Sequence, residues 1–138
     1  MMEKNIKLFV LLFCLAAQLC IAQTKVLFST NSESGKYGMA DYMITAFTQE
    51  TLKTGYDVYR DSYNKDAQDA RDDIDVVVLV SYSDRYSKGS VNAIVMNPID
   101  KKVIMVYDSG IYKRKRLMRN SNLVAMDFIR QFKTKVKN

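Results

Sequence analysis

The sequence contains no histidine and no tryptophan, and its two cysteines stand at positions 14 and 20. Histidine is the commonest general base and the commonest metal ligand, so its absence removes the usual acid–base chemistry. Because no cysteine follows position 20 either, zinc sites and Cys/His catalysis are excluded from the rest of the chain. No G-x-S-x-G pattern of a serine nucleophile occurs. We therefore expect that the protein is not an enzyme and that it uses no cofactor.

The first 22 residues have the pattern of a secretory signal peptide. Lys4 and Lys7 give a positive start, residues 8–17 are almost entirely apolar, and Cys20-Ile21-Ala22 places small residues before a cleavage site. The apolar stretch is shorter than the ~20 residues that a membrane-spanning helix needs. We predict a cleaved signal peptide at residues 1–22, no transmembrane anchor after cleavage, and a periplasmic or secreted location.

Both cysteines lie inside this signal, so the remaining chain has no disulfide and no reactive thiol. Lipid attachment is not expected, because Phe13 and Leu19, not small residues, precede the two cysteines. Residues 23–138 then form a single globular α/β domain, since the chain is 48% hydrophobic and 26% charged and has no linker or repeat.

The stretch Asp75 to Tyr82 (D-V-V-V-L-V-S-Y) organises the predicted fold, because its five consecutive aliphatic residues include four valines. Such a run is typical of a strand at the centre of a sheet with helices packed on it. Other apolar or alternating runs predict strands at 25–30, 56–60, 91–96 and 103–107. The last two are joined by N-P-I-D-K-K, which predicts an antiparallel hairpin with Pro98 in its turn.

Helical spacing of apolar residues predicts a helix over 39–53 and a final helix capped by Asn120 or Ser121. The buried stripe of the final helix is expected to hold Ala125, Ile129, Phe132 and Val136. Residues 31–38 and 83–90 are expected to be polar loops, and 64–73 a short surface helix or an irregular connector. The predicted fold class is α/β (α+β): one mixed sheet of about five strands in the order β-α-β-(α)-β-β-β-α, with amphipathic helices packed on it.

Two sequence patterns suggest ligand sites but lack the required spacing. Ser34-Gly35-Lys36 lacks the upstream glycine and the following Ser or Thr of a phosphate loop. The five aspartates between residues 66 and 75 lack the alternating ligands and the glycine of a calcium loop. We expect neither a phosphate loop nor a metal site.

Residues 112–119 (Y-K-R-K-R-L-M-R) hold five basic residues among eight. Charge runs of this kind are often solvated loops, but they also attract anionic partners. The candidate partner-binding residues are Tyr112, Lys113, Arg114, Lys115, Arg116 and Arg119. Leu117 and Met118 are either core residues or the apolar part of a contact. Tyr82, Arg85 and Tyr86, at the end of the central strand, are secondary candidates, because tyrosine is enriched at interfaces.

Three stretches resemble the small envelope α/β domains of the TolB amino-terminal type, which include LpoB-like activators of peptidoglycan synthases. They are T-G-Y-D-V-Y-R, D-A-R-D-D-I-D-V-V-V-L-V-S-Y and A-I-V-M-N-P-I-D-K-K-V-I-M-V-Y-D-S-G. In the family these places read sG-x-f-x-v-v-d-r, aDyvv and vDp-x-t-g-k-v-v-W. This chain departs from the pattern at Tyr107, where tryptophan is common, and at Pro98, which precedes the turn aspartate. The resemblance spans residues 25–137 and implies a binding module without catalytic residues.

The expected function is that of a non-catalytic periplasmic adaptor that contacts a cell-envelope protein. The alternative is direct binding of an anionic envelope polymer or lipid through residues 112–119. Nucleic acid is not expected as a partner, despite the sequence pI of about 9.3, because the chain carries an export signal.

Overall fold

A computed structural model describes residues 5–7, 23–30, 38–61 and 73–138, apart from the side chain of Arg85. The signal peptide predicted at 1–22, the loop predicted at 31–38 and the connector predicted at 64–73 therefore lie almost wholly outside the described residues. Among the described residues, no helix has the length and apolar character needed to cross a membrane.

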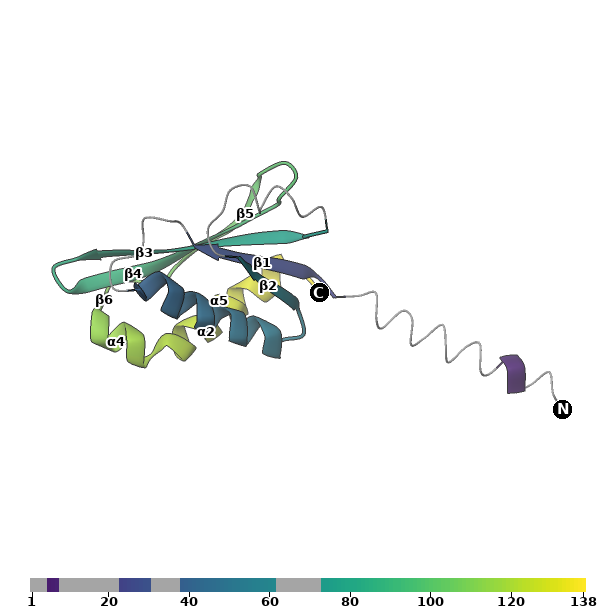
Figure 1. Cartoon of the computed structure of the whole chain (residues 1–138), viewed down its shortest axis with the longest axis horizontal. Helices are drawn as coiled ribbons and strands as arrows, with labels where there is room; N and C mark the ends of the chain where they lie inside the picture. The colour runs from purple at the N-terminus through teal and green to yellow at the C-terminus, as the bar shows by residue number, and fades with distance from the viewer. Residues whose placement is uncertain (1–4, 8–22, 31–37, 62–72) are drawn as a thin grey trace.

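The core of the fold is a mixed sheet with the strand order β2-β1-β3-β4-β5 (Figure 1). Its strands are β1 (Lys25–Thr30), β2 (Asp57–Asp61), β3 (Val76–Arg85), β4 (Lys88–Met96) and β5 (Val103–Asp108), and the short β6 (Tyr112–Lys113) pairs with β4. The first strand is parallel to both of its neighbours, and the later pairs are antiparallel. The predicted mixed sheet and the hairpin around Pro98 are confirmed.

Helices α2 (Met39–Lys53), α4 (Arg114–Arg119) and α5 (Ser121–Lys135) all lie on one face of this sheet (Figure 1). Aromatic rings fill the space between the layers: Phe47 and Phe128 stack with centroids 4.7 Å apart, and Tyr107 meets Phe128 edge-on at 5.6 Å. Because such rings bury large apolar areas and pack in preferred geometries, they account for much of the stability of the domain. Leu27, Ile74 and Val77 form a smaller buried cluster.

The side chains of the central strand, β3, point alternately to the two faces of the sheet, and apolar residues lie on both faces. Val76, Val78, Val80 and Tyr82 belong to the main core, whereas Val77 belongs to the smaller cluster. A strand with apolar side chains on both faces can fill two clusters at once, which explains the unbroken aliphatic run.

The prediction of a polar connector at residues 83–90 is wrong. β3 and β4 continue as an antiparallel ladder to Arg85 and Lys88, and only Tyr86 and Ser87 form the turn between them. Both turn residues have positive φ, 55° and 62°, which is the geometry of a tight hairpin turn of type I′. The sequence does not indicate this turn, because Tyr86 and Ser87 stand where type I′ turns usually have Asn-Gly.

The final helix begins at the predicted place, and its predicted stripe of Ala125, Ile129, Phe132 and Val136 is buried. Asn120 is its N-cap residue but makes no side-chain capping bond. Its backbone N–H instead donates to the carbonyl of Arg116 at 3.0 Å, because α4 runs directly into α5.

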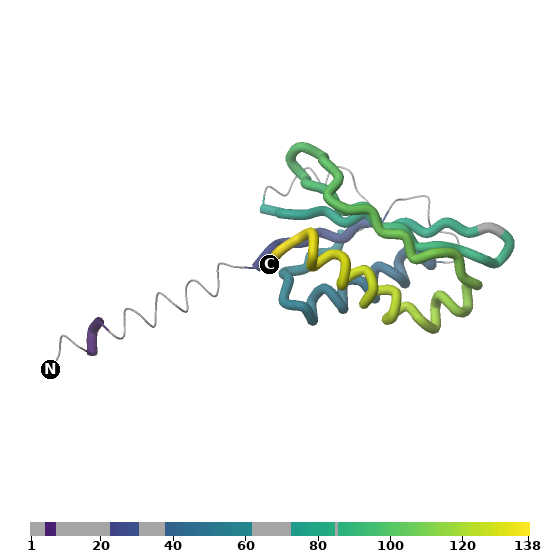
Figure 2. Tube along the Cα trace, turned by 180° about the vertical axis from the view of Figure 1, so that it is seen from behind, coloured from purple at the N-terminus to yellow at the C-terminus, as the bar shows by residue number. Residues whose placement is uncertain are grey.

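The C-terminal residues return to the start of β1, where the two ends of the domain lie side by side (Figure 2). The Thr24 N–H donates to Asn138 Oδ1 at 2.8 Å, and the Thr24 hydroxyl donates to the Lys137 carbonyl at 2.9 Å. The Asn138 side-chain amide donates to the carbonyl of Gly55 at 2.8 Å. The last residues therefore join β1 to the turn that precedes β2.

Candidate functional site: the basic end

The β3–β4 hairpin turn, β6 and α4 meet at one end of the molecule (Figure 1). Lys88 and Gly89 pair with Lys113 and Tyr112, so β6 extends the sheet beside the turn. The backbone N–H of Arg114 donates to the Ser87 carbonyl at 3.0 Å, which fixes the start of α4 against the turn. The primary and the secondary candidate residues, about 30 positions apart in the chain, thus lie in one place.

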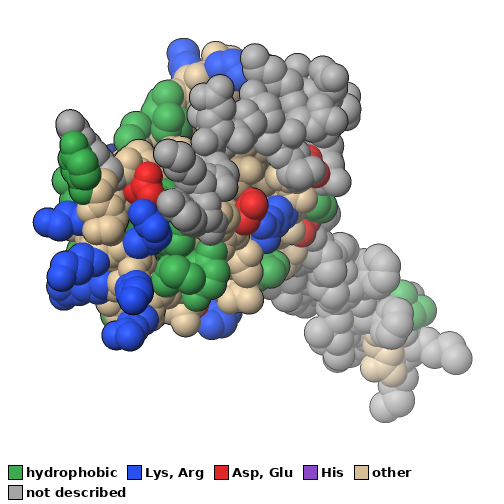
Figure 3. Space-filling model, turned by 60° about the vertical axis from the view of Figure 1, so that its left-hand side comes forward, with side chains coloured by type: hydrophobic (Ala, Val, Ile, Leu, Met, Phe, Trp, Pro, Cys, Tyr) green, Lys and Arg blue, Asp and Glu red, His purple; other side chains and the backbone are tan. Residues whose placement is uncertain are grey.

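Five exposed cations define what we call the basic end: Lys88, Lys113, Lys115, Arg116 and Arg119. They come from β4, β6 and α4, and Figure 3 shows Lys and Arg side chains gathered on the side of the molecule that carries these elements. Cations clustered on one surface raise the local potential and speed the approach of an anionic partner.

Exposed apolar side chains lie among these cations. Tyr86 at the turn is 85% exposed and Ile111 is 75% exposed, while Tyr112 and Met118 are 38% and 40% exposed. A hollow of about 450 Å³ is lined by Tyr86, Lys88 and Ile111 together with the end of the hairpin. Mixed apolar and cationic surface of this kind differs from a purely solvated charge run.

Arg114 is placed differently from its basic neighbours. Its guanidinium donates to Asp84 Oδ2 at 3.0 Å, and the two side chains are only 28% and 17% exposed. This partly buried ion pair joins α4 to β3 and therefore orients the helix. Arg114 holds the basic end together and offers little charge to a partner.

Leu117 and Tyr82 lie inside the domain. Leu117 is 1% exposed and belongs to the main core. Tyr82 is 7% exposed, and its ring and hydroxyl fill the space above Gly89, where a Cβ would overlap them. Of the secondary candidates whose side chains are described, Tyr86 is thus the one that reaches solvent.

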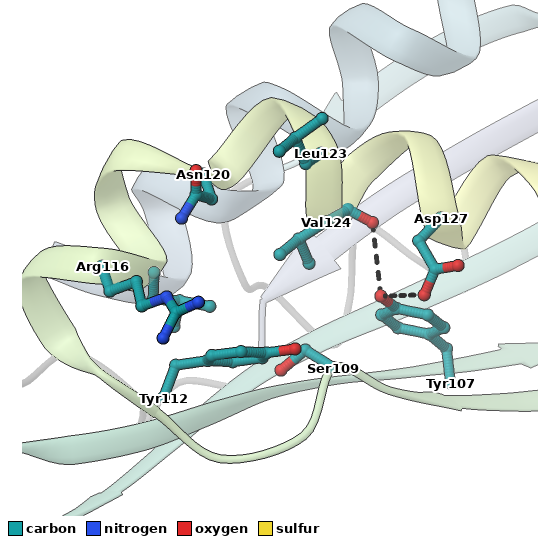
Figure 4. A pocket seen from close by; sticks show the side chains of 9 residues that line it. Tyr107, Ser109, Tyr112, Arg116, Asn120, Leu123, Val124 and Asp127 are labelled. Carbon is teal, nitrogen blue, oxygen red and sulfur yellow. Dashed lines mark hydrogen bonds between the residues drawn. The ribbon is translucent and has the colours of Figure 1, made fainter.

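A groove adjoins the basic end between β5, the loop after it, α4 and α5 (Figure 4). Its volume is about 390 Å³. The Arg116 guanidinium lies 5.9 Å above the ring centre of Tyr112 at one end, a distance typical of a cation–π contact. The Tyr107 hydroxyl donates to Asp127 Oδ2 at 3.1 Å at the other end.

Burial and the bond to Asp127 both raise the pKa of Tyr107 above its ordinary value of 10.0, because each disfavours the phenolate. The sequence pattern alone did not indicate Tyr107, Asn120 or Asp127 as site residues. They come from β5, the N-cap of α5 and α5, and no local motif links them. The described residues contain no group of three or more acidic residues placed to hold a metal ion.

No protein-family model matches the chain, and no curated protein matches its sequence. Solved structures with a similar fold include a single-residue variant of PelC from Paraburkholderia phytofirmans, described as a dodecamer. It is 14% identical with a TM-score of 0.55, over 75% of this chain and 84% of PelC. A lipoprotein from Neisseria meningitidis is 14% identical with a TM-score of 0.51, over 83% of this chain and 99% of the lipoprotein.

TolB from Acinetobacter baumannii is 12% identical with a TM-score of 0.52, over 80% of this chain. The match covers only 28% of TolB, so the chain corresponds to about a quarter of that protein. These likenesses confirm the α+β fold that the resemblance to the TolB amino-terminal type implies. They do not distinguish an LpoB-like type from the others.

Proposed function

We propose that this chain is a non-catalytic adaptor of the bacterial cell envelope that binds a protein partner through the basic end. The observation that carries the proposal is the meeting of five exposed cations and four exposed apolar side chains on one built surface. Tyrosine and arginine are enriched where proteins bind each other, because they combine apolar area with directed hydrogen bonds.

The hairpin turn supports this assignment. Residues other than glycine at positive φ are uncommon, and strained backbone of this kind clusters at functional sites. Here two such residues stand in succession, and the first of them, Tyr86, presents an 85% exposed ring. A turn that served only to connect β3 and β4 would be better built from Asn-Gly.

An envelope location is supported by the export signal predicted at residues 1–22 and by the fold shared with TolB and with a lipoprotein. The surface around Arg114 is also preformed, since its ion pair with Asp84 and its backbone bond to Ser87 fix α4 against the hairpin. Preformed surfaces lose less conformational entropy on binding.

The second candidate is direct binding of an anionic envelope polymer or lipid, which the five exposed cations favour. Binding of a protein partner and binding of a polymer or lipid differ in their salt dependence and in their selectivity. Attraction by exposed charges alone weakens steeply with ionic strength, because each charge is screened within a Debye length of ~10 Å at 0.1 M salt. Contacts of Tyr86 and Ile111 add apolar area whose contribution salt does not screen.

The test is photo-crosslinking from position 115 in the cells that express the protein natively, followed by mass spectrometry of the adducts. We expect one dominant protein adduct, which the double variant K113E/R119E reduces at least about tenfold, because two rim charges are reversed. The matched control K102E/K133E changes the net charge equally, at exposed positions away from the basic end.

A ladder of glycan or lipid adducts would replace the adaptor proposal by the second candidate. Equal loss of the adduct in K102E/K133E would show that overall charge, not the basic end, governs the contact.

A further inference from the structure

The groove beside the basic end carries opposite charges at its two ends (Figure 4). We propose that it binds a short zwitterionic peptide, with the peptide carboxylate at Arg116 and the peptide ammonium at Asp127. This site shares Arg116 and Tyr112 with the protein-binding surface, and it does not depend on the adaptor function.

Arg116 is suited to a carboxylate at the positive end. A guanidinium presents several donors in a planar fork that matches the two oxygens of a carboxylate. Its position over the Tyr112 ring, 5.9 Å from the centroid, directs it toward the groove.

Asp127 supplies the negative end. The Tyr107 hydroxyl donates to its Oδ2 at 3.1 Å and thereby holds the carboxylate at the mouth of the groove. Its Oδ1 lies 3.8 Å from the Arg130 guanidinium, whose side chain is 77% exposed. Such an exposed pair contributes little energy, so an ammonium group can compete for Asp127.

The dimensions of the groove select a ligand of about three residues. It runs along α5 from Asn120 to Asp127, which is about 10 Å at the helical rise of 1.5 Å per residue. Three extended residues cover about 10 Å, which matches this stretch of the groove. The volume of about 390 Å³ lies in the range of small-ligand sites.

The sides of the groove are apolar enough to accept small side chains. Leu123 and Val124 line one wall and the rings of Tyr107 and Tyr112 line the other (Figure 4). Leu123 is 62% exposed, so a ligand would remove its apolar surface from water. Small apolar residues between two charged termini therefore complement the site best.

The experiment is a titration of the ¹⁵N-labelled protein with tri-alanine, followed by NMR chemical shifts. Matched probes are N-acetyl-tri-alanine, which lacks the ammonium, and tri-alanine amide, which lacks the carboxylate. We expect saturable shifts confined to residues 107–127, and at least about tenfold weaker binding of each capped peptide, because each loses one charge-assisted hydrogen bond.

The variants R116Q and D127N are each expected to weaken the binding of tri-alanine at least about tenfold. R116Q is also expected to abolish the preference for tri-alanine over tri-alanine amide. R119Q on the same helix and D41N on α2 are the controls, since neither residue lines the groove. Equal affinity for the free and the capped peptides would overturn the proposal, as would shifts elsewhere or no shifts at about 10 mM peptide.

Different variants test the protein-binding proposal and the peptide-binding proposal, so one can be refuted without the other. K113E/R119E leaves every groove residue in place, so its effect reports only the protein partner. D127N lies outside the basic end, so its effect reports only the peptide.

Discussion

The strained hairpin turn yields the prediction that separates stability from function most directly. Replacing Tyr86 by Asn and Ser87 by Gly introduces the pair that type I′ turns prefer. We expect the double variant Y86N/S87G to be more stable than the parent and a poorer binder of the envelope partner.

The magnitude follows from the backbone angles. A residue with a Cβ pays roughly 1–2 kcal/mol in the left-handed region, and both turn residues occupy it, at φ 55° and 62°. Asn reduces this cost and Gly removes it, but Gly also loses about 0.5–1 kcal/mol through the freedom it gains in the unfolded chain. Little burial is lost, because Tyr86 is 85% exposed. The expected gain is about 1 kcal/mol.

The assay is urea unfolding followed by circular dichroism, with thermal unfolding as a second measurement. A gain of about 1 kcal/mol raises the melting temperature by about 4 °C in a domain of this size. S87A is the matched control, because alanine keeps the Cβ at positive φ and should give no stabilisation. In the crosslinking experiment from position 115, Y86N/S87G should give less adduct despite its higher stability, because the exposed ring is gone.

The reasoning is refuted if S87A stabilises the protein as much as the double variant. It is also refuted if Y86N/S87G melts below the parent, since the turn residues would then make stabilising contacts that outweigh their strain.

Three further changes test the packing. G89A should lower the free energy of unfolding by about 1–3 kcal/mol, because the added Cβ overlaps the buried ring of Tyr82. Urea unfolding measures this, and G89A should cost less in the Y82A background than in the parent, because the overlapping ring is gone. Since the pKa of Tyr107 is raised, the unfolded state loses its phenolic proton first as pH rises, so stability that is full below about pH 10 falls above it; Y107F should flatten this alkaline limb in melts from pH 8 to 11.5. N138A removes the hydrogen bonds to Thr24 and Gly55 and should cost about 1–2 kcal/mol, whereas K137A, which keeps its backbone carbonyl, should cost little.

Much of the fold is encoded in local pattern. The aliphatic run at 76–80, the alternation at 56–60 and the helical spacing of 39–53 each indicate an element without knowledge of the rest of the chain. Such periodicity shows which side chains of an element are buried. A few consecutive residues are enough to show whether one face or both faces of the element are covered. The mixed sheet followed because a helical crossover and a tight hairpin favour opposite strand directions.

The sequence alone did not indicate where β3 ends and where β4 begins. Residues 83–90 are polar and lack a glycine-rich turn pair, so the local pattern favours a loop. They form strands because the ladder from Tyr82–Val91 to Arg85–Lys88 continues and because β6 pairs with β4 from the other side. Strand pairing depends on distant partners, which a local pattern cannot report.

The sequence by itself determined the charge of residues 112–119, the absence of histidine and the amphipathic helices. Tertiary structure alone decided which candidate side chains are available to a partner. It paired Arg114 with Asp84, buried Tyr82 over Gly89 and left Tyr86 exposed. It also placed Arg116 and Asp127 at opposite ends of one groove. The physical reason is that a side chain's charge and size are local properties, whereas its exposure and neighbours are set by the packing of the whole chain.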